Sequence, residues 1–160
     1  MMKGRIAIPI HDHQGQLVAY CGRAGTPEQV EEEGKYKLPP NFVKSAVVYN
    51  LHRQAEPVAF LVLVESYLSV WKLWEAGFLS ACALMDSDLS KTQEKLILEL
   101  LGRSGRVVLL FDGDESGQAC TADSLSRLAS QLFVKAVVIS PYGRKPHQLE
   151  SDQLKELLTT

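Results

Sequence analysis

The sequence predicts an α/β protein in which a parallel sheet carries helices on both faces and follows a small β-rich N-terminal lobe. Two observations lead to this fold class. After about residue 55, apolar strand-like runs alternate with stretches of helical periodicity, as in successive βαβ units. Before that point, short alternating segments are separated by turn residues. We therefore expect a lobe over residues 1–55, an α/β domain over 56–145 and a C-terminal helix within 146–160.

The N-terminal lobe is predicted to begin with a β-hairpin. Residues 5–10 (RIAIPI) and 16–22 (QLVAYCG) have strand character, and the polar HDHQG between them is typical of a turn. The two histidines of that turn are not expected to bind a metal, because neighbouring residues at a strand end point in different directions. Residues 22–42 are rich in Gly, Pro and charge and predict loops. The lobe is expected to end near RQAEP, residues 53–57.

The α/β part opens with a nearly continuous apolar run, residues 58–65 (VAFLVLVE), which is typical of a strand covered on both faces. A helix over 66–77 should follow, because apolar residues recur there at helical spacing and Gly77 suits its C-terminus. The two tryptophans of this helix are expected to pack against the protein instead of stacking on bases. Residues 79–85 (LSACALM) predict the second strand.

Capping signals and periodicity place the remaining elements. Ser90 and Gln93 predict a capping box for a helix that ends at Gly102. Another helix should start near Ser116 and bury one side. The side that we expect to be buried consists of Ala119, Ala122, Leu125, Leu128 and Leu132. The other expected elements are strands at 106–111 and 134–140 and a short amphipathic helix at 151–158.

Three carboxylates follow two strands of the predicted sheet. Asp112 and Asp114 come after the third strand of the α/β part, on a turn that Gly113 permits, and Glu65 ends the first strand. Because the carboxyl ends of parallel strands share one edge of a sheet, we expect these groups to converge. Such a cluster favours Mg²⁺ or Mn²⁺, which can clamp phosphate oxygens. We expect no lysine of these motifs to neutralise the carboxylates.

Each of these acids also has a simpler role open to it. Asp112 and Asp114 could cap the helix that follows them, since aspartate is a favoured N-cap residue. Glu65 could serve only as a favourable charge at the N-terminus of its helix. The joint placement of the three residues favours the metal site.

The composition narrows the class of protein. The chain has 160 residues, 46% of them apolar and 22% charged, with a formal net charge of −2, which is typical of an ordinary globular protein. We find no membrane-spanning run and no signal peptide, and therefore expect a cytoplasmic location without a membrane partner. The three cysteines form no C-x-x-C pair, which excludes a local zinc ribbon. No P-loop or G-x-G-x-x-G follows a strand.

The order of these motifs resembles a known family. The segments LVLVESYLSVWKLWEAGF and VVLLFDGDESGQAC are similar to the Toprim domain of bacterial primases, topoisomerases and some nucleases. The upstream segments GRIAIPIHDHQGQLVAYCGR, GKYKLP and VKSAVVYNL resemble the N-terminal part of the RNA-polymerase domain of bacterial DNA primase. The resemblance extends from about Gly4 to Leu149.

The resemblance implies a function and assigns residues to it. It implies metal-dependent joining of nucleoside triphosphates into an RNA primer on single-stranded DNA, with Mg²⁺ or Mn²⁺ as cofactor. Glu65 would act in acid/base chemistry and metal binding, and Asp112 and Asp114 would be metal ligands. A zinc-ribbon domain or a helicase would come from a longer chain or a partner. The basic positions that would contact template or nucleotide phosphates are Arg23, Lys35 and Lys44.

Several residues depart from the family pattern. Lys145 and His147 stand where primases usually have acids, and Ser66 replaces the usual Gly after the Toprim glutamate. Asp86 and Asp88 lie in an unusual MDSDLS segment, where we expect a role at the start of a helix. These changes favour weakened catalysis.

Two alternative functions follow from the same residues. One is a catalytically degenerate Toprim module that binds nucleic acid or a replication partner. The other is a haloacid-dehalogenase-like phosphatase, because LLFDGDE resembles the nucleophile loop of that family. The phosphatase leaves Glu65 unexplained, and too few residues follow Asp114 to hold its remaining motifs.

Overall fold

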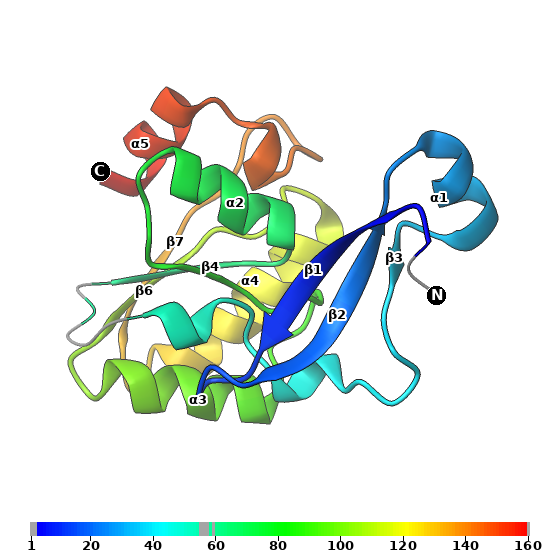
Figure 1. The fold of residues 1–160 in the computed structure, drawn as a ribbon. Coiled ribbons are helices and arrows are strands. Elements are labelled where there is room, and N and C mark those ends of the chain that lie inside the picture. Colours follow the sequence, from blue (N-terminus) through cyan, green and yellow to red (C-terminus); the bar gives the residue numbers. More distant parts are fainter. Residues whose placement is uncertain (1–2, 55–57, 59, 160) are drawn as a thin grey trace.

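A computed structural model describes residues 3–54, 58 and 60–159. It contains an antiparallel sheet of order β1-β2-β3 and a parallel sheet of order β5-β4-β6-β7 (Figure 1). The predicted α/β fold class with an N-terminal β lobe is confirmed. The strands are β1 (Arg5–His11), β2 (Leu17–Ala24), β3 (Tyr36–Lys37), β4 (Leu61–Val64), β5 (Ala81–Ala83), β6 (Arg106–Leu109) and β7 (Phe133–Ala136).

Helices cover both faces of the parallel sheet. Leu61 and Leu63 of β4 point into a core that α3 (Lys91–Leu101) and α4 (Glu115–Leu128) complete. Val62 and Val64 point the other way, into a core shared with α2 (Tyr67–Glu75) and α5 (Ser151–Thr159). All four β4 residues are fully buried, as their unbroken apolar run predicts. None of the helices in the described ranges has the length and apolar character needed to cross a bilayer.

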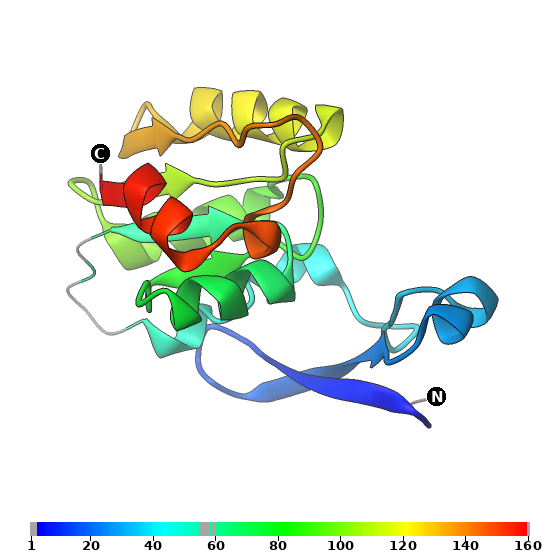
Figure 2. The same cartoon turned by 90° about the horizontal axis from the view of Figure 1, so that it is seen from above.

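The N-terminal sheet packs against the α/β part through its inner face. Ile8 and Ile10 of β1 and Cys21 of β2 are buried together with Tyr67, the first residue of α2. A bridge between Tyr49 and Ala83 joins the connecting segment to the edge strand β5. Figures 1 and 2 show that the open end of the β1–β2 hairpin, where β1 begins and β2 ends, projects from the side of the molecule together with α1. Short 3-10 helices lie at Lys44–Ala46, Leu51–Arg53 and Pro146–Gln148.

The expectation of loops throughout 22–42 is wrong. Residues Pro27–Glu33 form the helix α1, and Tyr36–Lys37 form β3. Thr26 caps α1 by accepting a hydrogen bond from the backbone N–H of Gln29, and a proline in the first turn is compatible with helix. The Thr-Pro-Glu start is a helix signal that the high charge and glycine content of the segment concealed.

Only part of the expected lobe boundary lies within the described residues. Of residues 53–57, positions 55–57 lie outside the described residues, as does Ala59 in the predicted strand 58–65. The division at residue 55 stays a prediction.

The prediction of the buried side of α4 is confirmed only in part: Leu128 and Leu132 are buried, but the other three predicted residues are not. Ala119, Ala122 and Leu125 are exposed. The side that packs inward consists of Gly117, Cys120, Ser124 and Leu128. Gly117 sets this orientation, because a Cβ atom there would lie 2.0 Å from the carbonyl oxygen of Asp112. The first turn of α4 therefore sits directly on the end of β6.

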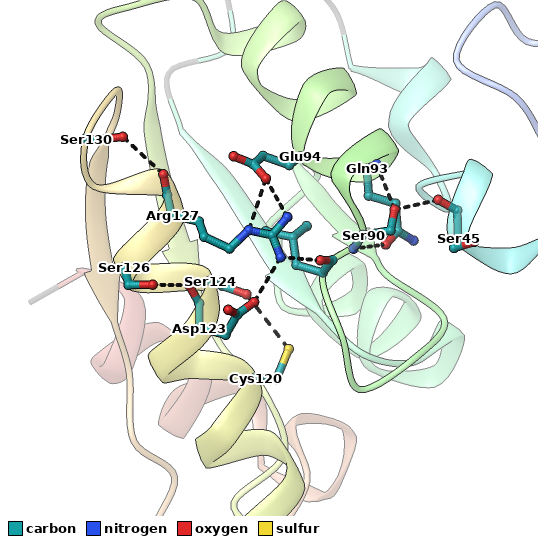
Figure 3. A network of polar contacts seen from close by, with 11 residues as sticks. Ser45, Ser90, Gln93, Glu94, Cys120, Asp123, Ser124, Ser126, Arg127 and Ser130 are labelled. Atoms are coloured by element: carbon teal, nitrogen blue, oxygen red, sulfur yellow. Dashed lines mark hydrogen bonds and ion pairs between the residues drawn. The ribbon is translucent and has the colours of Figure 1, made fainter.

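A polar clamp holds α4 against α3. The Arg127 guanidinium pairs with Glu94 of α3 and with Asp123 of its own helix, and it donates to the carbonyl oxygen of Leu89 (Figure 3). Ser90 and Gln93 form the predicted capping box at the start of α3. These contacts fix the helix that places Asp114 at its N-terminus.

Candidate functional site

The three predicted carboxylates meet where the chain connections diverge. The connection after β4 runs through α2 on one face of the sheet, and the connection after the neighbouring strand β6 runs through α4 on the other face. Such a switch point opens a crevice at the carboxyl ends of the strands. Glu65 follows β4 and Asp112 follows β6, and the backbone N–H of Asp112 donates to Oε1 of Glu65 at 2.9 Å. The predicted convergence is present.

Asp114 has two functions in this geometry. Its Oδ1 accepts a hydrogen bond of 3.0 Å from the backbone N–H of Gly117, so it is the N-cap of α4. Its Oδ2 lies 3.7 Å from Nζ of Lys145. The capping role that the sequence left open is therefore real, and it leaves one carboxylate oxygen directed to the crevice.

The expectation that no lysine neutralises the carboxylates is wrong. The Lys145 ammonium donates a hydrogen bond to Oδ2 of Asp112. Asp112 is only 6% exposed, and its Oδ1 is buried without a hydrogen-bond partner among the described residues. A buried carboxylate is costly without a compensating charge, and Lys145 supplies that charge here.

Backbone hydrogen bonds hold Lys145 beside the aspartates. The N–H of Gly113 donates to the carbonyl oxygen of Arg144 at 2.7 Å. The N–H of Gly143 donates to the carbonyl oxygen of Gly113 at 2.8 Å. The N–H of Lys145 donates to Oε1 of Gln148 at 2.8 Å. A Cβ at Gly113 would lie 2.9 Å from the Arg144 carbonyl oxygen, so glycine permits this close approach.

The crevice is a cavity of about 350 Å³ with mixed charge. The N-terminal lobe closes one side of it with Lys35 and Tyr36. Its remaining lining residues are Glu65, Ser66, Met85, Asp86, Ser87, Asp112, Asp114, Ser116, Lys145 and His147. Acidic and basic side chains therefore face one another across a space large enough for a small anionic ligand or a hydrated cation.

Burial shifts the pKa values of several groups that line the cavity. Burial raises the pKa of the Glu65 carboxyl to about 7, and the nearby charges of Asp112 and Asp114 add to the increase, while the hydrogen bond from the Asp112 N–H opposes it. Burial lowers the pKa of Lys35, and the positive charges of Arg23 and Lys145 lower it further. The shift of Glu65 suits a carboxyl that exchanges a proton near neutral pH.

The pKa of Lys145 shifts in the opposite direction to that of Lys35. Burial alone would lower the pKa of Lys145, but the hydrogen bond to Asp112 and the charges of Asp112, Asp114 and Glu65 raise it. Burial lowers the pKa of His147, whose Nδ1 lies 3.4 Å from Oγ of Ser69. The cationic form of Lys145 is therefore stabilised in the site.

The three basic residues predicted to bind phosphates lie in different surroundings. Lys35 lines the cavity, and Arg23 acts electrostatically on both Lys35 and His147. Lys44 instead forms an ion pair of 2.7 Å with Asp86. This pair corrects the expectation that Asp86 acts at the start of a helix, because Ser90 caps α3. The structure therefore places Lys35 in the cavity with the carboxylates and Arg23 near Lys35 and His147, and it leaves Lys44 paired with Asp86.

The donor set fits a hydrated divalent cation. Within the described ranges, no three His, Cys, Asp or Glu side chains enclose a metal position. Mg²⁺, however, is commonly held by one or two carboxylates and keeps several waters. Two carboxylate oxygens provide such a pair: Oδ1 of Asp112, which has no hydrogen-bond partner among the described residues, and Oδ2 of Asp114, which lies 3.7 Å from Nζ of Lys145.

Sequence reasoning missed two features of the site. It noted Lys145 as a lost acid but not as the partner of Asp112, because the contact depends on the loop that Gly113 binds. It also gave no role to Met85, which lines the cavity with a left-handed backbone (φ 63°) and donates its N–H to the carbonyl oxygen of Glu65. The alternating burial of strands carries no signal for either.

Two family models match this chain. Residues 59–140 match the Toprim domain, and residues 1–55 match the N-terminal domain of the DNA primase catalytic core. Among curated relatives, the DNA primase of Mycoplasma pneumoniae is 35% identical over 139 residues. The match covers 85% of this chain but only 22% of that primase, so the chain corresponds to less than a quarter of its length.

Solved structures share the fold. The zinc-binding and RNA polymerase domains of Aquifex aeolicus primase superpose with a TM-score of 0.82 at 23% identity, over 99% of this chain and 40% of that one. A primase catalytic domain bound to single-stranded DNA superposes with a TM-score of 0.78 at 20% identity, over 98% of this chain and 51% of that one. Both the lobe and the parallel sheet have counterparts in these structures.

The raised pKa of Glu65 predicts a pH-dependent stability. Between about 4.5, the ordinary pKa, and about 7, the folded state keeps the proton that the unfolded state releases. The free energy of unfolding should therefore fall across this range as pH rises, and this contribution should become constant above it. Urea denaturation with a chelator present should show that Glu65→Gln gains on the order of 2 kcal/mol relative to wild type across the range.

The exposed Glu115 provides the control for this prediction. Glu115→Gln removes a carboxylate from the first turn of α4, outside the cavity lining. It should track the pH dependence of the wild type. A constant difference between wild type and Glu65→Gln from low to neutral pH would contradict the raised pKa.

Proposed function

Because this chain belongs to the Toprim domain family, in the form found in DNA primases, we propose that it carries the metal-dependent nucleotidyl-transfer site of a primase core and performs that reaction weakly. The observation that carries the proposal is the meeting of Glu65 and Asp112 at the switch point of the sheet. The match to the primase family also removes the support for a haloacid-dehalogenase-like phosphatase, which left Glu65 without a role.

Toprim primase domains are generally metal-dependent. We propose Mg²⁺ or Mn²⁺ as the ion, held by Asp112 and Asp114 with Glu65 beside them. Such an ion supplies Lewis-acid stabilisation of charge on phosphate oxygens. The chain's own residues would orient the ion and move protons. The capping bond to α4 holds Asp114 in place, and Glu65 holds or releases a proton near neutral pH. Nucleoside triphosphates are the proposed substrates.

Single-stranded DNA is the proposed template. The catalytic domain solved with single-stranded DNA has the same fold, and in this chain Lys35 lines the cavity on the side formed by the N-terminal lobe, with Arg23 close enough to lower the pKa of Lys35. Cationic side chains in that place would bind backbone phosphates without reading sequence. A zinc-ribbon domain or a helicase, from a longer chain or a separate partner, completes the proposed set of partners.

One observation favours a second function, a Toprim module that binds nucleic acid without turnover. The Lys145 ammonium contacts Asp112, one of the two aspartates proposed to hold the metal. A lysine can bind a phosphate as a point charge but cannot clamp two reacting oxygens as a pair of metal ions does. The two functions differ in whether primers are made, and not in whether DNA is bound.

The basic positions predict salt-dependent DNA binding. Replacing Arg23, Lys35 and Lys44 by Ala should reduce the magnitude of the slope of log K against log salt by roughly 1.4, since each single-strand phosphate contact contributes about 0.7 and the paired Lys44 should add little. Lys44→Ala alone should change the slope least, because Lys44 is paired with Asp86. Fluorescence anisotropy with a labelled oligonucleotide over a salt series measures the slope.

A variant of equal charge change controls for the net charge. Arg103, Lys95 and Lys155 are exposed and do not line the cavity. Replacing these three by Ala should leave the slope near that of wild type. Equal slopes in the two triple variants would show that the predicted positions do not contact DNA.

The departures from the family predict weak primer synthesis. The wild-type chain should incorporate labelled ribonucleotides poorly or not at all on a single-stranded template, because Lys145 and His147 replace acids that would help hold a metal. Lys145→Asp with His147→Asp should raise Mn²⁺-dependent dinucleotide synthesis at least severalfold, with Glu65→Gln as the blank. Robust synthesis by wild type would refute weakened catalysis, and no synthesis by any variant would favour the binding module.

A further inference from the structure

We propose that Lys145 is a built-in counter-ion of the Asp112 and Asp114 pair, which a divalent cation must displace before it can bind. The inference deepens the proposed function, because it concerns the same aspartates. It rests on the proposed function only in naming a divalent metal as the competing ligand. According to this proposal, the Lys145 side chain sets the affinity of the aspartate pair for a divalent metal.

The first support is the position of the ammonium. Nζ of Lys145 donates to Oδ2 of Asp112 and lies 3.7 Å from Oδ2 of Asp114, so one cation touches one carboxylate and faces the other. A metal bridging the two aspartates would need the same space. An ammonium and a divalent ion so close together would repel strongly in this partly buried site.

The second support is that the lysine backbone is held in place. The paired backbone hydrogen bonds between Gly113 and the 143–144 segment attach the loop to the turn that carries both aspartates. The contact is therefore a product of the fold and not of a loosely placed surface side chain. The Lys145 side chain is still 37% exposed, so it can rotate toward solvent while its backbone stays fixed.

The third support is that the two carboxylate oxygens of Asp112 differ in their hydrogen bonding. Its Oδ2 receives the ammonium, while its Oδ1 is buried and has no partner among the described residues. An ammonium offers directional hydrogen bonds and leaves this oxygen unsatisfied in the present arrangement. A hydrated metal could reach Oδ1 directly or through its waters. The pair is thus stable without metal but retains an unused ligand atom.

Lys35 offers a matched control. It lines the same cavity as Lys145, yet none of the ion pairs among the described residues involves it. Replacing either lysine by Met removes one positive charge and keeps a flexible chain of similar length. Only Lys145→Met removes the ion that occupies the aspartate pair.

The test is isothermal titration of Mn²⁺ into the chain, without nucleotide or DNA. Lys145→Met should bind Mn²⁺ more tightly than wild type by roughly tenfold or more, since the metal no longer has to break the ion pair between Lys145 and Asp112. Lys35→Met should differ from wild type by no more than about threefold, since a more distant charge is better screened. Adding Asp112→Asn to Lys145→Met should abolish the gain. Lys145→Arg keeps a cation at the pair and should keep binding weak.

Thermal unfolding with and without Mn²⁺ provides a second readout. Without metal, Lys145→Met should melt roughly 4 °C or more below wild type, because Asp112 loses its counter-ion. Saturating Mn²⁺ should restore that loss, and should do so even if the variant is largely unfolded without metal.

Three results would overturn the proposal. They are an unchanged Mn²⁺ affinity in Lys145→Met, an equal gain in Lys35→Met, and a destabilised Lys145→Met that Mn²⁺ fails to rescue. Because no primer synthesis is measured, a failure of the proposed function leaves this test unaffected, and the converse also holds.

Discussion

The buried carboxylate of Asp112 is the constraint around which the site is arranged. Asp112 follows β6, and its backbone N–H donates a hydrogen bond to Glu65. Its carbonyl oxygen lies against Gly117, where there is no room for a Cβ atom. The adjacent Gly113 is hydrogen-bonded to the loop that carries Lys145. Breaking a buried ion pair by removing one partner leaves an uncompensated charge that costs several kcal/mol. The chain therefore needs a cation at this point, and it contains one.

This arrangement changes what the family resemblance implies. Glu65, Asp112 and Asp114 are the acids that we propose for a metal-dependent site, yet Lys145 supplies positive charge there without a metal. An ammonium can stabilise the folded site and attract phosphate, but it provides neither open coordination positions nor a bridge between reacting oxygens. Under the proposed function, Lys145 would compete with metal binding but not with folding or with the binding of nucleic acid.

The sequence predicted the features that depend on strand order. The unbroken apolar run of β4 predicted burial on both faces, and parallel topology alone brought Glu65 to Asp112 across 47 positions. It did not predict features that depend on close backbone approach. The orientation of α4 follows from the space at Gly117 and from the Arg127 clamp, and neither leaves a periodic apolar signal. The partnership of Lys145 with Asp112 was missed for the same reason, since it requires the loop to dock on Gly113.

A crystal structure of the wild-type chain at saturating Mn²⁺, with manganese located by anomalous scattering, tests the central claim most directly. The account predicts manganese against Asp112 and Asp114, with the Lys145 side chain turned away from Asp112 and the backbone of its loop unmoved. Manganese bound at both aspartates while Lys145 still donates to Asp112 would contradict the displacement, because the two cations would then share the site.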